Sequence, residues 1–147
     1  IYVNSLASMI LGTPERIVSA AHLGETGVDE QAAMVYGYEG GKLALLSCAV
    51  RTSTFQEAAI YGTAGRIRIH SPWWHSEKLT LQRAGHDPET LTLPMQGNGY
   101  NYEAAEAMAC LAAGKLESDV MPLDETLAIM ETLDTVRGQW GLRYPME

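Results

Sequence analysis

The sequence predicts an α+β domain with a large, mainly antiparallel, open sheet and helices on one face of that sheet. Two observations lead to this class. Apolar residues at helical spacing are confined to the two ends of the 147-residue chain, and short apolar segments with strand-like patterns fill the stretch between them. The links between these segments are short and contain glycine or proline. Such links favour antiparallel pairing, because a parallel crossover needs about a dozen residues.

The chain begins with a predicted helix over residues 3–11, in which apolar side chains recur every three or four positions. Gly12 is expected to end this helix, and Pro14 to prevent its continuation. A turn at residues 39–42, with two adjacent glycines, is predicted to join two strands as a hairpin, since glycine readily adopts positive φ. The predicted strands cover residues 16–23, 31–38, 42–51, 54–62, 65–70, 78–83 and 90–93.

The last third of the chain is predicted to be helical. Asn101 is the expected N-cap of the second helix, and acidic residues follow it where the helix dipole favours negative charge. Gly114 is expected to end this helix. Pro122 suits the first turn of a third helix, whose apolar positions continue at spacings of three or four to Trp140.

The segment at residues 43–50 indicates how the domain assembles. Both of its alternating sets of side chains are apolar, whereas a half-exposed antiparallel strand should alternate apolar and polar side chains. Three helices can cover only one face of so large a sheet. We therefore expect the other face to contact a second protein surface, most simply a second copy of the chain in a homodimer or higher oligomer.

The composition is that of an ordinary globular protein, with 46% hydrophobic and 19% charged residues. The net charge is −8 and no basic stripe is visible, so nucleic-acid binding is not expected. No apolar run approaches the ~20 residues of a membrane-spanning helix. Cys48 and Cys110 lie in apolar segments and are expected to be reduced thiols of a cytoplasmic protein. No internal linker is visible, so residues 1–147 are interpreted as a single domain.

The known motifs for cofactor and metal binding do not occur in the sequence. Residues 97–99 form its only G-x-G, and Tyr102 stands where the third glycine of a dinucleotide fingerprint would be. We therefore expect no cofactor-binding residues in this chain. The cysteines and histidines show no zinc-binding spacing, so no metal site is expected. No special role is expected for the four histidines: His22, His70, His75 and His86.

Three features are candidates for a catalytic or binding role. Tyr2 carries a phenol that could exchange a proton with a substrate if a positive group lay beside it, and the neighbouring sequence offers none. Trp73 and Trp74 lie on a predicted loop, where extended backbone would point their indoles to opposite sides. One of them could line an apolar pocket or could close the end of the sheet. The loop at residues 97–103 could close over a ligand or could simply connect sheet and helix.

Seven short segments follow one another with the order and spacing of a known protein family. They are 25–30 (ETGVDE), 61–67 (YGTAGRI), 72–74 (PWW), 102–104 (YEA), 114–118 (GKLES), 121–125 (MPLDE) and 140–145 (WGLRYP). Over essentially the whole chain, this succession resembles the C-terminal half of the glucose-fructose oxidoreductase, inositol dehydrogenase and MocA (Gfo/Idh/MocA) family. Within the family it resembles the branch of the dimeric dihydrodiol dehydrogenases and xylose dehydrogenases.

The resemblance implies a fold and an activity. Members of the family join an N-terminal Rossmann domain to a C-terminal α+β domain like that of glyceraldehyde-3-phosphate dehydrogenase, and the open sheet usually packs on its copy in a dimer. Residues 1–147 would then be the substrate-binding and dimerisation domain, without the Rossmann domain and inactive alone. The parent would be an oxidoreductase for a sugar, polyol or trans-dihydrodiol, with NAD or NADP bound mainly by the missing domain. The alternative is a non-catalytic ligand-binding and oligomerisation module.

The resemblance also implies roles for three side chains. Tyr2 matches the tyrosine that ends a D-I-G-I-Y segment in related dehydrogenases, where it exchanges the substrate proton. The positive neighbour of this phenol would be the lysine of an E-K-P motif on the cofactor domain. Trp74 matches a tryptophan that lines the substrate pocket in the dihydrodiol branch, and Trp73 is a second, weaker candidate for the same pocket. No metal is implied.

Overall fold

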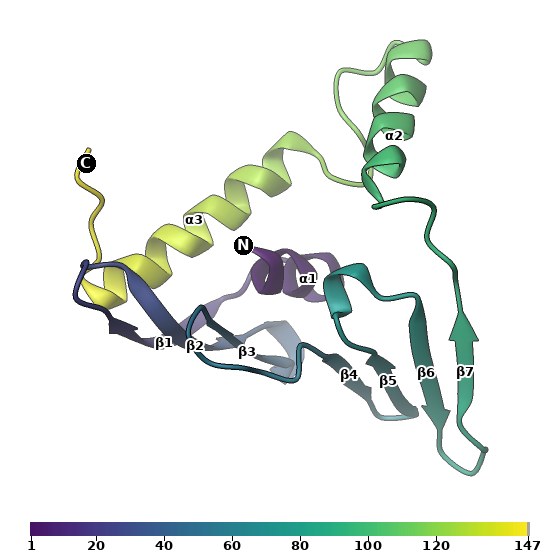
Figure 1. The fold of residues 1–147 in the computed structure, drawn as a ribbon, viewed down its shortest axis with the longest axis horizontal. Helices are drawn as coiled ribbons and strands as arrows, with labels where there is room; N and C mark the ends of the chain where they lie inside the picture. Colours follow the sequence, from purple (N-terminus) through teal and green to yellow (C-terminus); the bar gives the residue numbers. More distant parts are fainter. Residues whose placement is uncertain (147) are drawn as a thin grey trace. The chain divides into compact units, whose positions relative to one another are not determined.

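The computed structural model describes residues 1–146 of the chain. Within them lie the helices α1 (Tyr2–Leu11), α2 (Tyr100–Ala112) and α3 (Leu123–Trp140), with seven antiparallel strands between α1 and α2 (Figure 1). Short 3₁₀ turns occur at Glu39–Gly41 and at Trp73–His75. The predicted α+β class is therefore confirmed. None of the helices in this part of the chain is long and apolar enough to cross a membrane.

The seven strands form two hydrogen-bonded sheets, where the sequence had suggested a single one. The first sheet has the order β1 (Arg16–Leu23), β2 (Asp29–Gly37), β3 (Leu43–Ala49). The second has the order β4 (Ala58–Gly62), β5 (Gly65–Ile69), β6 (Lys78–Arg83), β7 (Glu89–Thr92). The strand predicted from residue 54 starts only at Ala58, because Gln56 has a φ of 53°, which is incompatible with extended backbone.

Contacts divide the chain into two compact units. The first unit comprises Ile1–Ser53 together with the chain from Asp119 onward, and the second comprises Thr54–Ser118. The first unit thus contains the three-stranded sheet with α1 and α3, and the second contains the four-stranded sheet with α2.

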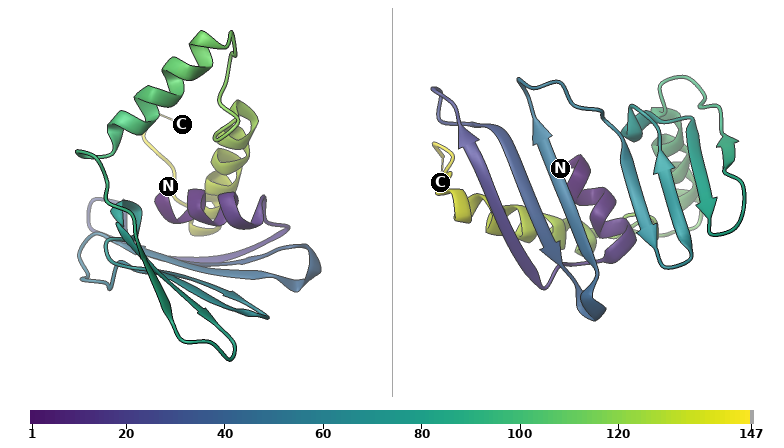
Figure 2. Two further views of the ribbon diagram at one scale, coloured as in Figure 1. Left: turned by 90° about the vertical axis from the view of Figure 1, so that its right-hand side faces the viewer. Right: turned by 90° about the horizontal axis from the view of Figure 1, so that it is seen from below.

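In the first unit, α1 and α3 lie on the same face of the three-stranded sheet (Figure 2). The core lies between these helices and the sheet and is centred on the buried side chains Met34, Tyr36, Tyr38 and Val136. The hairpin between β2 and β3 turns where it was predicted, with φ of 74° at Gly40 and 77° at Gly41. The turn therefore uses the positive φ that a side chain would disfavour.

The opposite face of the three-stranded sheet, here termed the outer face, carries an exposed apolar row. Val18 on β1 pairs with Val35 on β2, and Val35 pairs with Leu45 on β3, so the three side chains form one row across the sheet. Their exposed fractions are 51%, 43% and 78%. Both faces of β3 are thus apolar, and only one of them is covered by helices of this unit.

In the second unit, the four strands form a meander in chain order. One face of this sheet is apolar and includes Ile60, Ile67 and Leu81, which pair directly across the strands. The other face is polar and includes Arg68 and Thr80, which pair with each other. The helix α2 follows this sheet and buries none of its side chains.

Candidate functional site

The sequence-predicted site residues fall in different units. Tyr2 is the first residue of α1 in the first unit, whereas Trp73 and Trp74 lie in the second unit between β5 and β6.

Tyr2 is presented at the start of a helix that is held firmly in place. Its side chain is 62% exposed. Two residues further on, the amide oxygen of the buried Asn4 accepts a hydrogen bond of 2.5 Å from the hydroxyl of Tyr36 on β2. One turn later, the Ser8 hydroxyl donates a hydrogen bond of 2.8 Å to Glu125 on α3. The helix that carries Tyr2 is thus tied both to the sheet and to α3.

The Tyr36 hydroxyl stays protonated and can act as the donor in this contact. Burial, with smaller contributions from the neighbouring groups Tyr38 and Cys48, raises the pKa of Tyr36 to about 12. Burial also raises the pKa of Tyr38 above its ordinary value. A phenol with such a pKa keeps its proton throughout the physiological range, so the Tyr36–Asn4 bond does not depend on pH there.

A groove of about 530 Å³ lies on the helix side of the first unit, with Ile1 among its lining residues. A groove of this size is in the range of small-molecule sites. Its apolar wall includes Met34, Val136 and Trp140. Arg137 also lines it, and its guanidinium donates to Asp134 at 2.6 Å and lies 4.5 Å from the centre of the Tyr144 ring.

No local sequence pattern predicts this groove. Its charged side chains come from β2 and α3, and its apolar wall includes residues of α1, β2 and α3, which are distant in sequence. The only local signal was Arg137 three residues after Asp134, which places the two side chains on the same face of a helix. A pair at this spacing is common on exposed helices, so it does not by itself indicate a site.

Trp73 and Trp74 contact each other at the entry to β6. Their ring centroids are 6.0 Å apart and the rings meet edge to face at 86°. The backbone forms a 3₁₀ turn over Trp73–His75, so the expectation of extended backbone with opposed indoles was wrong. A tight turn after Pro72 brings the two rings together. Trp74 is 46% exposed and Trp73 is half-buried, so the pair offers an indole at the surface of the second unit.

The loop before α2 is organised by local hydrogen bonds. Asn98 accepts a hydrogen bond from the backbone N–H of Tyr100, and Gly99 is the N-cap, with a φ of 89°. The backbone N–H of Gln96 donates to the Tyr102 hydroxyl at 3.0 Å. The prediction that Asn101 caps this helix was therefore wrong. The N-cap lies two residues earlier, at Gly99, and the side chain of Asn98 accepts the first free N–H of the helix.

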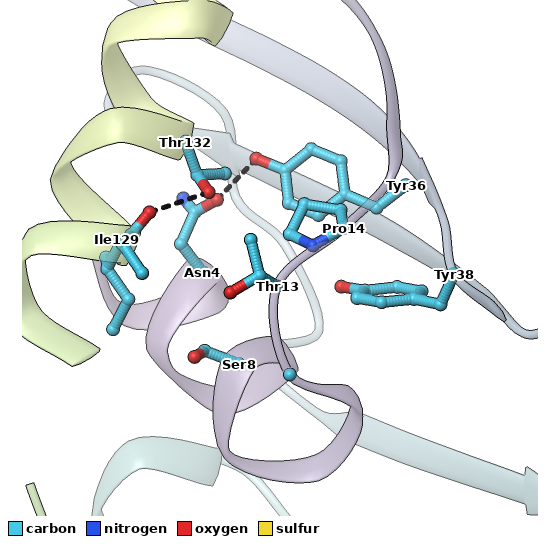
Figure 3. A pocket seen from close by; sticks show the side chains of 10 residues that line it. Asn4, Ser8, Thr13, Pro14, Tyr36, Tyr38, Ile129 and Thr132 are labelled. Carbon is cyan, nitrogen blue, oxygen red and sulfur yellow. Dashed lines mark hydrogen bonds between the residues drawn. The ribbon is translucent and has the colours of Figure 1, made fainter. Parts of the chain in front are cut away.

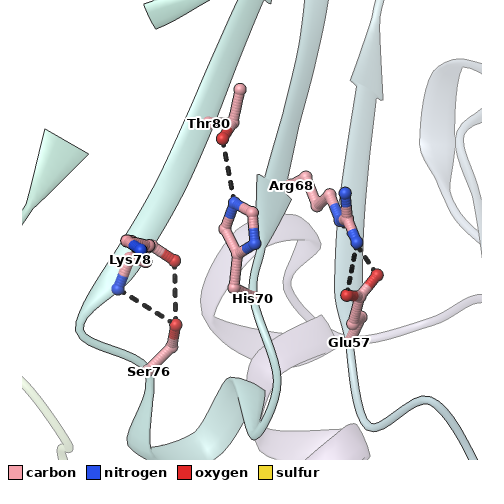
Figure 4. Close-up of polar contacts among 6 residues, drawn as sticks. All are labelled: Glu57, Arg68, His70, Ser76, Lys78 and Thr80. Atoms are coloured by element: carbon pink, nitrogen blue, oxygen red, sulfur yellow. Dashed lines mark hydrogen bonds and ion pairs between the residues drawn. The ribbon is translucent and has the colours of Figure 1, made fainter. Parts of the chain in front are cut away.

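The polar face of the second sheet carries two sets of hydrogen-bonded side chains (Figure 4). Arg68 forms a two-pronged ion pair with Glu57, which lowers the pKa of Glu57 and raises that of Arg68 through hydrogen bonding and charge. His70 Nε2 lies 2.9 Å from the Thr80 hydroxyl. Since both members of the ion pair are exposed, these contacts order a hydrated surface and contribute little to stability.

The described residues include neither a dinucleotide-binding turn nor a cluster of potential metal ligands. Gly97 and Gly99, the only G-x-G, form the turn that leads into α2, and Asn98 between them accepts a hydrogen bond from the Tyr100 N–H. Within residues 1–146, no three His, Cys, Asp or Glu side chains gather closely enough to hold a metal ion.

Comparison with known proteins identifies relatives over nearly the whole chain. No family model matches it. It is 34% identical over 138 residues to the trans-1,2-dihydrobenzene-1,2-diol dehydrogenase of Xenopus tropicalis, covering 90% of this chain and 42% of that protein. It is 28% identical over 154 residues to the human enzyme of the same name, covering 100% of this chain and 46% of that protein.

Solved structures show the same fold. UDP-N-acetylglucosamine 3-dehydrogenase from Acidithiobacillus ferrooxidans superposes with a TM-score of 0.79 at 13% identity, covering 95% of this chain and 44% of that one. Aldose-aldose oxidoreductase from Caulobacter crescentus also superposes with a TM-score of 0.79, at 15% identity. The match covers 94% of this chain and 42% of that one. The family predicted from the sequence is confirmed.

The chain spans less than half the length of the Gfo/Idh/MocA relatives that it matches. The names of these relatives describe dehydrogenases and oxidoreductases. A further structural neighbour, a 3-ketoreductase from Actinomadura kijaniata with a TM-score of 0.75, 18% identity and coverage of 95% of this chain and 45% of that one, was solved with NADP. The roles expected for Tyr2, Trp73 and Trp74 stay predictions at this point.

Proposed function

We propose that this chain is the C-terminal, substrate-binding and dimerisation domain of an NAD(P)-dependent oxidoreductase of the Gfo/Idh/MocA family. The observation that carries the proposal is the match, at about 30% identity, of essentially the whole chain to less than half of the dihydrodiol dehydrogenases. The substrate class is a sugar, a polyol or a trans-dihydrodiol. Residues 97–99, the only G-x-G, form a turn and not a dinucleotide-binding fingerprint. We therefore assign the cofactor to an N-terminal Rossmann domain of the parent protein.

Tyr2 is the residue that we assign to proton exchange with the substrate oxygen. Its phenol is exposed at the start of α1, and the contacts of Asn4 and Ser8 hold that helix in place, as proton exchange at a fixed position requires. The nicotinamide, when bound by the other domain, supplies or receives the hydride. The positive group that a working phenol needs would come from the same domain.

Trp74 is the residue that we assign to substrate binding. Its half-exposed indole is held edge to face by Trp73, so a rigid apolar surface is available for the non-polar side of a sugar or diol ring. Trp73 would act mainly by fixing the orientation of Trp74.

Replacing Trp74 with Ala in the complete protein is expected to raise KM roughly 10-fold while kcat stays within a few-fold of the wild-type value. A stacking surface binds the ground state and the transition state alike, so its loss changes binding more than turnover. Steady-state kinetics on a panel of sugars and diols measures this. The matched control is Phe55→Ala, which removes a 91% exposed aromatic side chain from the same unit. An unchanged KM for every substrate would remove Trp74 from the binding site.

The outer face of the first sheet is the surface that we assign to dimerisation. The row of Val18, Val35 and Leu45 is exposed, and a two-fold partner presenting the same row would bury it. Exposed apolar rows of this kind on an open sheet face are uncommon in monomers.

The proposed activity is tested by assaying the complete protein with NAD and with NADP against sugars, polyols and trans-dihydrodiols. Turnover is expected with at least one pair of cofactor and substrate, followed through the absorbance of the reduced nicotinamide. Residues 1–147 alone are expected to show no turnover, since the proposal assigns cofactor binding to the Rossmann domain. If the complete protein binds a sugar or diol but turns over none with either cofactor, the domain acts instead as a ligand-binding and oligomerisation module.

A further inference from the structure

A small cavity lies in the first unit where α1, β2 and α3 meet (Figure 3). It leaves about 10 Å³ for the centre of a water molecule, which is enough for one water and too little for a sugar or a nucleotide. Its lining is rich in side-chain oxygen atoms, which come from Asn4, Ser8, Thr13, Tyr36, Tyr38 and Thr132.

Tyr38 places an unpaired polar group against this cavity. The residue is 5% exposed, and its hydroxyl is shielded from solvent without a hydrogen-bond partner among residues 1–146. In Figure 3 the hydroxyl is directed toward the side where Thr13 and Asn4 lie. A buried hydroxyl without a partner is costly, and nearly all such groups in folded proteins bind either another protein group or an ordered water.

The other hydroxyl groups that line the cavity can still accept hydrogen bonds. Three of these hydroxyls already donate their single proton to another protein oxygen: Tyr36 to Asn4, Thr132 to the backbone of Ala128, and Ser8 to Glu125. Each keeps lone pairs on its own oxygen atom. None of these three hydroxyls can therefore donate to Tyr38 without losing its present contact. A water molecule can both accept from Tyr38 and donate to such oxygen atoms.

We propose that one buried water molecule binds in this cavity, with the hydroxyl of Tyr38 as one of its partners and the polar side chains of α1 or α3 as the others. Tyr38 directly follows β2, and α1 packs over the same sheet. Asn4 and Ser8 of α1 line the cavity, so a water bonded to either of them adds to the Tyr36–Asn4 contact in fixing α1 on the sheet. The proposal concerns only the first unit and holds whether or not Tyr2 is catalytic.

A crystal structure of the complete protein at high resolution tests the proposal directly. The expected result is a peak of density inside the cavity, at ~2.5–3.0 Å from the Tyr38 hydroxyl oxygen. A dry cavity would overturn the proposal, and so would a Tyr38 hydroxyl that donates to a protein group instead.

The substitution Tyr38→Phe gives an independent test through stability. If the hydroxyl binds water, its removal should raise the equilibrium constant for opening of the first sheet about 5- to 30-fold, measured by hydrogen exchange of the β2 amides. If the hydroxyl is simply unpaired, its removal should leave that constant unchanged or lower it, and the proposal is wrong. The control is Tyr61→Phe, which removes a hydroxyl from a 76% exposed tyrosine and should change nothing. If Tyr38→Phe does not fold, the wild-type crystal structure decides.

Discussion

Replacing Tyr2 with Phe in the complete protein is expected to lower kcat by about 100- to 10,000-fold, the usual contribution of a positioned acid or base. The substitution removes one oxygen atom and leaves the ring, and the residue is exposed at the first turn of α1, so no change in folding is expected. The cofactor affinity should stay within about two-fold, since binding energy that does not involve the phenol is unaffected. Steady-state turnover and a separate titration of the cofactor measure the two quantities.

The control for this experiment is Tyr61→Phe, which removes a phenol hydroxyl from an exposed strand position in the second unit. Its kcat should equal that of the wild type. If Tyr2→Phe also keeps its turnover within a few-fold of the wild-type value, the proton must move through another group, and the assignment of Tyr2 fails even though the family membership stands.

Replacing Leu45 with Asp is expected to convert a dimer of the complete protein into monomers. Leu45 is the most exposed member of the apolar row on the outer face, and a partner copy would enclose its side chain. A carboxylate enclosed there without a positive partner should raise the dissociation constant of the dimer by about 100-fold or more. Light scattering at micromolar concentration measures the change in mass.

A leucine that lies off this face serves as the matched control. Leu116 is 99% exposed in the second unit, so Leu116→Asp introduces the same charge without touching the outer face. That variant should keep the mass of the wild type. A wild-type protein that is itself a monodisperse monomer would contradict the proposed assembly at once.

Most of the fold could be predicted from the sequence, because local patterns determine it. The bounds of β1 and β6 agree with the prediction, since apolar runs and turn residues define both ends. The glycine hairpin before β3 also agrees. Two of the errors occur where a single residue adopts an unusual backbone conformation, as Gln56 does before β4 and Gly99 does before α2.

The candidate site was less accessible to prediction. Residue type and family resemblance were enough to propose Tyr2 and Trp74 as site residues. The side chains that contact and position their helix or turn could not be predicted. The Asn4–Tyr36 bond joins residues 32 positions apart, and the Ser8–Glu125 bond joins residues 117 positions apart. Neither pair leaves a periodic pattern in the sequence, since such contacts exist only after the helices have packed on the sheet.

The double attachment of α1 has a mechanical consequence. Asn4 and Ser8 are one turn apart on the helix, and one is bonded to the sheet while the other is bonded to α3. Rolling α1 about its own axis would break at least one of these bonds, and sliding it lengthwise would strain both. The two bonds therefore restrict both rotation and sliding of α1, so two other residues of the helix fix where the backbone of Tyr2 lies relative to the first sheet.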